Sequence, residues 1–587
     1  MTVLGLLHGH NSSSALIGDK LEGCISEERL TRLKNATSFP QLSSQQLLSQ
    51  AGITVDDVEL VVSASRAVPF VDERQIKIYE DERVNKASTL ESKIKKFLHQ
   101  TYYYLPVVRR LLEQLYLLHY EWQMSERQQA KVRDKICKEL GFDGKVAFAD
   151  HHLCHAYTGY FGFVPVEYRD RPYLVFTLDG EGDGLCATIS TVKDGQWTRV
   201  STTTAGHSVA SFYGAITKFL GMKVNEHEYK VMGLAPYCSP GTEEELVGKF
   251  HQLFKIREDL SFSAKGGGNY MSLWLTKNLD NYRFDVVAAA AQRFVEDIAI
   301  DWITKAVEKF GIPNIVLSGG FFMNIKVNQR IRELGVIDKM FVCPSGGDES
   351  IALGACYYGL EKLGKPRETE QLAAPNLYLG SDIDAGECRE LAASVRKQGI
   401  HKVEECDDIE ATIARLLADG EIVARVSGRM EFGARALGNR SILANASSYT
   451  VVRDINKLIK GRDFWMPFAC SILEEHAFDY LDVETLESLE YMAMGAPTKA
   501  LAQTHLAAGI HQYDHSARPQ IVKRSQNPEY HRIISLYREL TGMGGILNTS
   551  LNLHGEPLVC SPEDALHTFE RSGLPHLALS NVLISKS

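Results

Sequence analysis

Short apolar runs separated by turn residues open the chain. The stretch "TVLGLL" leads into a polar loop, "SALIG" follows it, and "LEGCISEE" comes directly after "DK". Apolar runs of this length, bounded by turns, predict a three-stranded meander that opens a mixed sheet.

Residues 66–141 have a different character, because they are rich in charges and aromatic rings and show helical spacing. An apolar stripe at this spacing begins just after Pro106 and comprises Val107, Val108, Leu111, Leu112, Leu115 and Leu118. We predict a helical insertion beside the sheet. Its aromatic residues, Tyr102, Tyr103, Tyr104, Tyr116 and Trp122, suit one wall of a cleft for a bulky ligand. Packing of the insertion, or a homodimer interface, is the favoured alternative.

The pattern then becomes one of alternating strands and helices. "YLVFTL" predicts a strand that stops at Asp179, and a helix is predicted from Asp285 to Phe310. "NIVLSGGFFMN" and "MFVCPSGGDESIALGACY" each predict a strand, a glycine loop and a helix. Such units are typical of α/β folds, whose ligands gather at the carboxyl ends of the strands. The polar stretch 364–376 is the predicted linker, and a second α/β unit follows it.

Composition narrows the class of protein. A chain of 587 residues predicts more than one domain, and its net charge of −10 argues against a nucleic-acid binder. No apolar run is long enough to span a bilayer, and the first residues indicate strand, turn and strand rather than a signal peptide. The eleven cysteines include no C-x-x-C pair, which fits reduced thiols. We therefore expect a cytoplasmic protein without membrane or nucleic-acid partners.

The stretch "FADHHLCHAYTGYF" contains candidate metal ligands. In a helix, His151 and His155 stand at i and i+4 on one face, while His152 points about 100° away. Alone, this spacing favours a histidine-rich helix start without metal. Asp179 in "LDGEGDG" and Asp348 in "GGDESIALG" lie at predicted strand ends. Two imidazoles and two carboxylates would suit Fe2+, Zn2+ or Mn2+.

Several loops are candidates for binding a nucleotide. "HGHNSSS" and "LSGGFFMN", the second containing Gly319, Gly320 and Asn324, offer backbone N–H groups that can bind phosphate. Tight turns are the equal alternative for both loops. Glu228 and Lys230 in "EHEYKVMGLAPY" suit a nucleotide cleft, with a structural salt bridge as the equal alternative.

The second half contains a dense cationic stretch within an acidic protein, interleaved with apolar residues and glycines. Its basic residues are Arg425, Arg429, Arg435, Arg440, Arg453, Lys457, Lys460 and Arg462. Guanidinium groups bind phosphates and carboxylates through two parallel hydrogen bonds. A charge run is usually a solvated surface, but the interleaving here favours a buried anion pocket.

Many motifs in a fixed order resemble those of one family. They are "HNSSSAL", "SEERLTR", "DHHLCHA", "LDGEGDG", "EYKVMGLAPY", "SGGFFMN", "GGDESIALGA", "GRMEFGARALGNRSIL", "NTSLN" and "GEPLVCSPEDAL". The chain resembles the O-carbamoyltransferases of antibiotic and nodulation-factor biosynthesis, which include the tobramycin and cephalosporin enzymes. The resemblance covers nearly the whole length, and "GARALGNRS" is its most specific part.

The resemblance implies two joined α/β modules. Residues 1–370 would form an actin-like, ATPase-type domain similar to threonylcarbamoyl-transfer proteins, with the insertion at 66–141. Residues 371–587 would form an adenylate-forming (YrdC-like) domain. That domain would make carbamoyl-adenylate from carbamoyl phosphate and ATP, and the first would pass the carbamoyl group to a hydroxyl of a small-molecule, natural-product acceptor.

Site residues follow from the same resemblance. The metal ligands would be His151, His155, Asp179 and Asp348, with Fe2+ the favoured metal and Mg2+ a candidate companion of ATP. Contacts to ATP and carbamoyl phosphate would come from Arg435, Lys460, Arg518, Asn548 and Ser550. His10 would lie near the metal, as a base or a carbamoyl-binding group. Arg435 and Lys460 would act in catalysis, and Arg440 would also contact the nucleotide.

Departures and rival functions define what must be tested. Met466 stands where the family often has arginine, and His515 and Ser516 stand where glycine and threonine are usual.

One rival is an actin-fold kinase or ATPase, which leaves the cationic half without a role. A tRNA-modifying enzyme built from the same modules would want a basic surface. A metal- or nucleotide-binding protein without turnover is the third.

Overall fold

The computed structural model describes residues 2–67, 115, 118, 121–266 and 268–586. The predicted stripe at Val107–Leu112 and four of the five aromatic residues of the insertion lie outside this part. Within it, the helical prediction is confirmed for α6 (Glu126–Leu140), and Trp122 is 57% exposed. No helix in the described ranges is long and apolar enough to cross a membrane.

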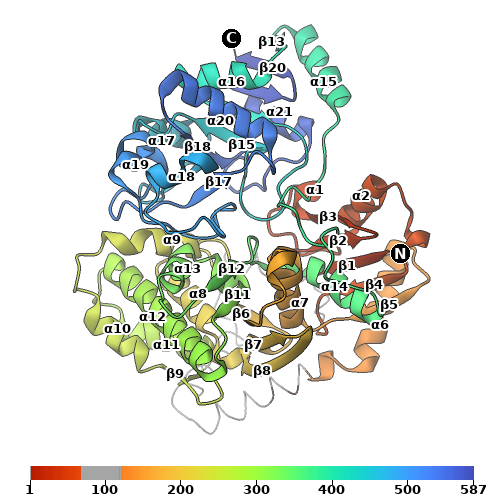
Figure 1. Ribbon diagram of the computed structural model, residues 1–587, viewed down its shortest axis with the longest axis vertical. Coiled ribbons are helices and arrows are strands. Elements are labelled where there is room, and N and C mark those ends of the chain that lie inside the picture. The colour runs from red at the N-terminus through yellow and green to blue at the C-terminus, as the bar shows by residue number, and fades with distance from the viewer. Residues whose placement is uncertain (1, 68–114, 116–117, 119–120, 267, 587) are drawn as a thin grey trace, which may run out of the picture.

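Two five-stranded sheets organise what we call the N-terminal lobe, residues 2–362 (Figure 1). The first has the order β3-β2-β1-β4-β5, built from β1 (Val3–Leu7), β2 (Ser13–Ile17), β3 (Leu21–Ser26), β4 (Leu60–Ser63) and β5 (Lys145–Phe148). The second has the order β12-β11-β6-β7-β8, built from β6 (Tyr173–Gly182), β7 (Leu185–Lys193), β8 (Gln196–Thr204), β11 (Asn314–Ser318) and β12 (Lys339–Val342). The predicted opening meander is confirmed, since β1, β2 and β3 pair antiparallel.

Strand β6 is longer than predicted. It continues past Asp179 to Gly182, because its last residues pair with β7 in a hairpin after an irregularity in the register. A small pair, β9 (Phe254–Ile256) and β10 (Phe262–Ala264), completes the strands of this lobe in the described residues.

Helices α7 (His151–Tyr157) and α14 (Ile351–Lys362) pack against each other between the two sheets. Helix α14 contacts β1, β2 and β4, while α7 contacts β6 and β11. Two glycines permit this approach. A Cβ atom on Gly5 would lie 2.0 Å from the Ala352 carbonyl oxygen, and one on Gly354 would lie 1.9 Å from the Cys154 carbonyl oxygen. The helix that carries the histidines is therefore held at a fixed distance from α14.

The remaining helices of the N-terminal lobe surround these layers. They are α1 (Glu28–Thr31), α2 (Gln41–Ala51), α8 (Val209–Phe219), α9 (Glu228–Leu234), α10 (Glu244–His251), α11 (Gly268–Asn278), α12 (Phe284–Phe310) and α13 (Ile325–Arg332). The long helix α12, predicted from Asp285, contacts α8, α9, α10 and α13. It ends at Gly311, whose φ of 64° continues the chain in the left-handed region that glycine tolerates.

An eight-stranded mixed sheet forms the core of the C-terminal lobe, residues 385–586 (Figure 1, upper part). Its order is β13-β20-β19-β14-β15-β18-β16-β17, built from β13 (His401–Glu405), β14 (Val423–Val426), β15 (Arg440–Ala444), β16 (Ala469–Leu473), β17 (Pro519–Val522), β18 (Gly545–Ser550), β19 (His576–Leu579) and β20 (Val582–Lys586). Its helices are α15 (Ala385–Gln398), α16 (Ile409–Ala418), α17 (Thr450–Ile455), α18 (Ala477–Tyr480), α19 (Ala500–His505), α20 (Pro528–Thr541) and α21 (Pro562–Arg571). The predicted linker, 364–376, contains neither helix nor strand. The predicted division at residue 370 stays a prediction.

Candidate metal centre and anion site

The histidine pair lies at the start of α7, as its spacing predicts. Asp150 caps the helix by accepting from the Leu153 N–H at 2.8 Å, and Arg199 holds this carboxylate at 2.6 Å. His151 and His155 are 5% and 0% exposed, and their ring centroids lie 4.8 Å apart. The ring of His152 points elsewhere, because its Nδ1 lies 2.9 Å from the Thr177 hydroxyl.

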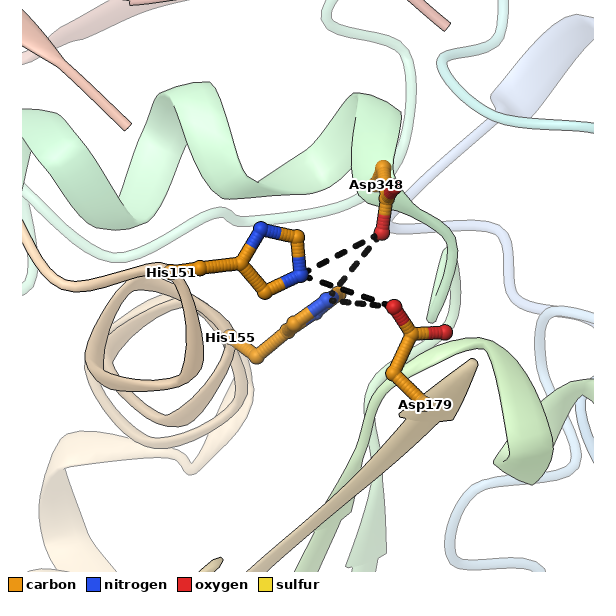
Figure 2. Close-up of side chains that lie close together, drawn as sticks. All are labelled: His151, His155, Asp179 and Asp348. Atoms are coloured by element: carbon orange, nitrogen blue, oxygen red, sulfur yellow. Dashed lines mark ion pairs between the residues drawn. The ribbon is translucent and has the colours of Figure 1, made fainter. Parts of the chain in front are cut away.

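Two aspartates that lie far from this pair in the sequence face it (Figure 2). Asp179 comes from β6, and Asp348 comes from the turn before α14. His151 Nε2 lies 3.5 Å from Asp179 Oδ2 and 3.6 Å from Asp348 Oδ1. The corresponding distances from His155 Nε2 are 3.8 and 3.3 Å. We call these four residues the metal quartet.

The quartet fits a divalent metal ion. Its four candidate ligand atoms all lie within 4.8 Å of one another. Ligands at about 2.1 Å in a tetrahedron stand about 3.4 Å apart, which is close to the four N···O distances. The buried Nε2 atoms of His151 and His155 have no hydrogen-bond partner in the described residues. Burial lowers the pKa of His151, but Asp348 and Asp179 raise it more, to about 9, so this site favours positive charge between the rings and carboxylates.

Neighbouring groups hold the ligands in place. The Asp183 carboxylate accepts from the His151 N–H at 2.9 Å and from the Ser65 hydroxyl at 2.7 Å, so it joins α7 to the end of β4. The Gly320 N–H donates to Asp179 Oδ1 at 3.2 Å, which leaves Oδ2 for the metal. A side chain at Gly182 is excluded, since its Cβ would lie 2.1 Å from the His151 ring.

Four basic side chains of the C-terminal lobe form what we call the cation cluster: Arg435, Lys460, Arg462 and Arg518. Burial lowers the pKa of each, and Arg435 lowers the pKa of Arg462 and of Arg518 further. Among the described residues none of the four forms an ion pair with a carboxylate. Lys460 is buried and the three arginines are half-buried. Cations in such positions normally have an acidic partner, so the cluster would suit a polyanion.

Serine and threonine hydroxyls of β18 line the cation cluster. Lys460 Nζ donates to Ser550 Oγ at 3.1 Å and to Asn552 Oδ1 at 2.7 Å. Arg462 donates to the Thr549 hydroxyl at 3.1 Å. These hydrogen bonds place Ser550 beside Lys460, two residues that the resemblance predicts as contacts to ATP and carbamoyl phosphate.

Two other residues of the C-terminal lobe that were predicted to contact the nucleotide or carbamoyl phosphate bind protein groups instead. The fully buried Arg440 donates to the carbonyl oxygens of Cys560, Ser427 and Gly428, at 3.0 to 3.1 Å. The Asn548 Nδ2 group donates to Ala436 O, and to a serine and a glutamine of adjacent strands. Arg440 and Asn548 thus hold the backbone around the cation cluster, which sequence patterns alone do not reveal.

Three residues of the N-terminal lobe that were predicted to contact the nucleotide also bind protein groups. Lys230 forms an ion pair with Asp463 at 3.0 Å, so it binds the loop of Arg462 from across the lobe interface. Glu228 accepts from the Asn225 N–H at 2.8 Å. Asn324 caps α13 by accepting from the Val327 N–H at 3.2 Å.

Gly319 and Gly320 pack against the end of β6. Gly319 has φ of 103°, and a Cβ atom there would lie 2.4 Å from Leu178 O. A Cβ atom on Gly320 would lie 2.7 Å from Asp179 Oδ1. These glycines therefore serve the metal quartet directly, and their role toward a phosphate stays a prediction.

His10 is exposed in the turn after β1. The same hairpin reaches the metal loop, because the Ser13 hydroxyl donates to Glu349 O at 2.7 Å, one residue after Asp348. A role for His10 near the metal stays a prediction.

The three departures from the expected motif occupy contacts within the protein. A Cβ atom on Gly233 would lie 3.3 Å from Met466 Sδ, so Met466 packs against α9. Ser516 accepts from Lys326 of α13, and His515, whose φ is 54°, turns the same loop.

Sequence patterns do not reveal two residues whose charges act on Arg435 from the N-terminal lobe. Glu349, adjacent to Asp348, and Tyr229, on α9, both raise the pKa of Arg435 against the larger lowering effect of burial. A Cβ atom on Gly433 would lie 2.4 Å from Ser345 Oγ, so the loop of Arg435 contacts the loop of Asp348. No local signal identifies these contacts, because they depend on how the lobes pack.

Known proteins align with both lobes. A family model described as "Carbamoyltransferase N-terminus" matches residues 2–357, and one described as "Carbamoyltransferase C-terminus" matches residues 414–586. Nodulation protein NolNO of Sinorhizobium fredii is 29% identical, over 98% of this chain and 79% of its own. Nodulation protein NolO of Bradyrhizobium diazoefficiens is 31% identical, over 74% of this chain and 79% of its own. An uncharacterized Methanocaldococcus jannaschii protein is 29% identical, over 100% of this chain and 99% of its own.

Similarity to solved structures is much weaker. The crystal structure of T. kodakarensis HypF aligns with a TM-score of 0.32 at 10% identity, over 62% of this chain and 48% of its own. Similarity at this level carries no argument about fold or function.

Proposed function

The chain belongs to the carbamoyltransferase family and is a carbamoyltransferase, and from this premise we propose that it carbamoylates a hydroxyl of a small-molecule acceptor at the expense of ATP. In the C-terminal lobe, carbamoyl phosphate, ATP and one water yield carbamoyl-adenylate, pyrophosphate and phosphate. In the N-terminal lobe, the acceptor hydroxyl attacks the carbamoyl carbon, AMP leaves with the bonding electron pair, and a base takes the hydroxyl proton.

The observation that carries this proposal is the cation cluster, whose four side chains have no acidic partner within the part of the chain that the structure describes. ATP and carbamoyl phosphate bring several negative charges, and transfer to the α-phosphate develops more on pyrophosphate. Buried guanidinium and ammonium groups stabilise such charge more strongly than water-exposed ones. Arg435 and Lys460 are our candidates for catalysis, with Arg462 and Arg518 as further phosphate partners.

The metal quartet supports the second step. His151, His155, Asp179 and Asp348 would hold the ion, and two imidazoles with two carboxylates suit Fe2+. A bound ion supplies Lewis-acid polarisation of a carbonyl oxygen. Asp183 and Gly320 fix the orientation of the ligands, and His10 is our candidate base.

Contact between the two loops supports transfer within one chain. The loop of Arg435 touches the loop of Asp348 at Gly433 and Ser345, so a reactive adenylate formed at the cation cluster has a short route to the metal quartet. We further propose an actin-like fold for the first domain, a YrdC-like fold for the second, and a natural-product alcohol as acceptor.

Mass spectrometry tests the proposal. The protein, carbamoyl phosphate and ATP should give carbamoyl-adenylate and one phosphate for each pyrophosphate, and an alcohol screen should then identify the acceptor. A protein that binds ATP but releases neither product would be a metal- or nucleotide-binding protein without turnover. Carbamoylation of tRNA instead of an alcohol would indicate a tRNA-modifying enzyme.

A further inference from the structure

The loop of residues 431–440, which we call the Arg435 loop, is held from its inner side by one buried carboxylate. Glu431 is fully buried, and its Oε1 accepts from the N–H groups of Leu437, Asn439 and Arg440 at 2.7, 2.8 and 3.1 Å. The loop therefore closes around this oxygen. Arg435, at its centre, has a side chain with no hydrogen bond to any described residue.

Carbonyl groups on both sides of Arg435 are also bound. After it, Ala436 O accepts from Asn548 Nδ2 at 3.1 Å, and Leu437 O accepts from Gln520 Nε2 and the Tyr378 hydroxyl, both at 2.8 Å. Each of these donors lies in or beside the C-terminal lobe. The backbone after Arg435 is thus fixed without help from the metal-binding lobe.

The backbone before Arg435 is bound from the other lobe. Arg29, on α1, donates from a terminal guanidinium nitrogen to Gly433 O at 2.6 Å, and its side chain is buried. Gly433 has φ of 96° and leaves no room for a side chain against Ser345. Gly433 is therefore the point at which two elements of the N-terminal lobe meet the Arg435 loop.

We propose that Arg29 is a positioning residue for anion binding at the cation cluster, acting through Gly433 on the orientation of Arg435. The Arg29 side chain is buried against Gly433 O and the Glu28 carboxylate, so it would act on a bound anion through the loop. Without its hydrogen bond, a buried carbonyl two residues from Arg435 loses its charged donor, and the loop loses its only hydrogen bond from the metal-binding lobe among the described residues. The inference rests on the proposed function of the cation cluster, and it makes the first step depend on the lobe that performs the second.

A matched control exists on the same helix turn. Arg32 also crosses the lobe interface, donating to Leu558 O at 2.6 Å and to Pro557 O at 3.0 Å, and none of its hydrogen bonds or ion pairs with described residues reaches the Arg435 loop. Loss of Arg32 weakens lobe contact in general, whereas loss of Arg29 removes a contact to this loop. Comparison of the two variants separates positioning from docking.

The test measures pyrophosphate affinity by calorimetry and carbamoyl-adenylate formation by mass spectrometry. Arg29→Ala should bind pyrophosphate about tenfold more weakly, with free guanidinium restoring much of the affinity. The pyrophosphate affinity of Arg29→Lys should lie between those of the wild type and Arg29→Ala, since an ammonium keeps one donor and the charge. Arg32→Ala should bind within about twofold of wild type.

Two results overturn the inference: wild-type pyrophosphate affinity in both Arg29 variants, or equal losses in Arg29→Ala and Arg32→Ala. Metal content and thermal unfolding establish that each variant is folded, and Arg29→Lys keeps the test decisive if Arg29→Ala does not fold. A wild-type protein that binds pyrophosphate but makes no adenylate would refute the proposed reaction, and the affinities would still decide the role of Arg29.

Discussion

Removing one positive charge from the cation cluster should stabilise the protein while it weakens anion binding. Burial and Arg435 lower the pKa of Arg462 to about 10, from an ordinary value of about 12.5. This shift means that the folded protein disfavours the charged guanidinium by about 3 kcal/mol. Arg462→Met keeps the length of the side chain and removes the charge.

Two lost contacts offset part of this gain. The hydrogen bond to Thr549, at 3.1 Å, and the guanidinium over the Phe468 ring, at 4.7 Å, are worth about 1 kcal/mol each. The variant should therefore be about 1 kcal/mol more stable, and the C-terminal transition should melt about 2–4 °C higher. Scanning calorimetry without ligand measures this change.

Pyrophosphate should reverse the order of stability of the wild type and Arg462→Met. At one hundred times its Kd it stabilises the wild type by about 2.7 kcal/mol, and Arg462→Met should lose most of this shift. Arg453→Met is the matched control, since Arg453 is 77% exposed and pairs only with Asp454 in the described residues; its melting should stay within about 0.5 kcal/mol of wild type. A less stable Arg462→Met that binds pyrophosphate normally would refute the reasoning.

Three further outcomes are expected. His151→Ala/His155→Ala should lose the metal that the wild type holds, as plasma emission measures, whereas His152→Asn should keep it. Metal affinity, measured by chelator competition, should tighten as pH rises to about 9, because His151 must lose a proton to bind. The pKa of His151 in the folded protein exceeds the unfolded value of about 6.5. The stability that this proton gives the metal-free protein is therefore present below about pH 6.5 and lost as pH rises through about 9. Gly354→Ala, whose Cβ would lie 1.9 Å from a carbonyl of α7, should cost about 1–3 kcal/mol in urea unfolding and loosen metal binding, while Gly248→Ala, in open space on α10, should not.

Local patterns were enough to predict that the four side chains of the metal quartet lie together, while metal binding itself stays a prediction. The i, i+4 spacing of His151 and His155 places both rings on one helix face, and strand ends in an α/β unit converge on one edge. Asp179 and Asp348 therefore could be predicted, although they lie far apart in the sequence. The same patterns predicted the opening meander and the long helix α12.

The cationic stretch was predictable as charge but not as geometry. Nothing in its sequence distinguishes Arg435 and Arg462, which join the cluster, from Arg440, which binds carbonyl groups, or Arg453, which is exposed. These fates depend on how the strands of the eight-stranded sheet and the two lobes pack. The contact from Arg29 to Gly433 joins positions 404 residues apart, so no local period encodes it.

The division of the reaction between the lobes is the central claim, and one comparison tests it most directly. Carbamoyl-adenylate is measured by mass spectrometry after carbamoyl phosphate and ATP are added to His151→Ala/His155→Ala and, separately, to Arg435→Ala. We predict adenylate at near wild-type level in the histidine variant, with no carbamoylated acceptor, and none in Arg435→Ala. Adenylate at the wild-type rate in Arg435→Ala would contradict the account. Loss of adenylate formation in a histidine variant that is still folded without its metal would contradict it as well.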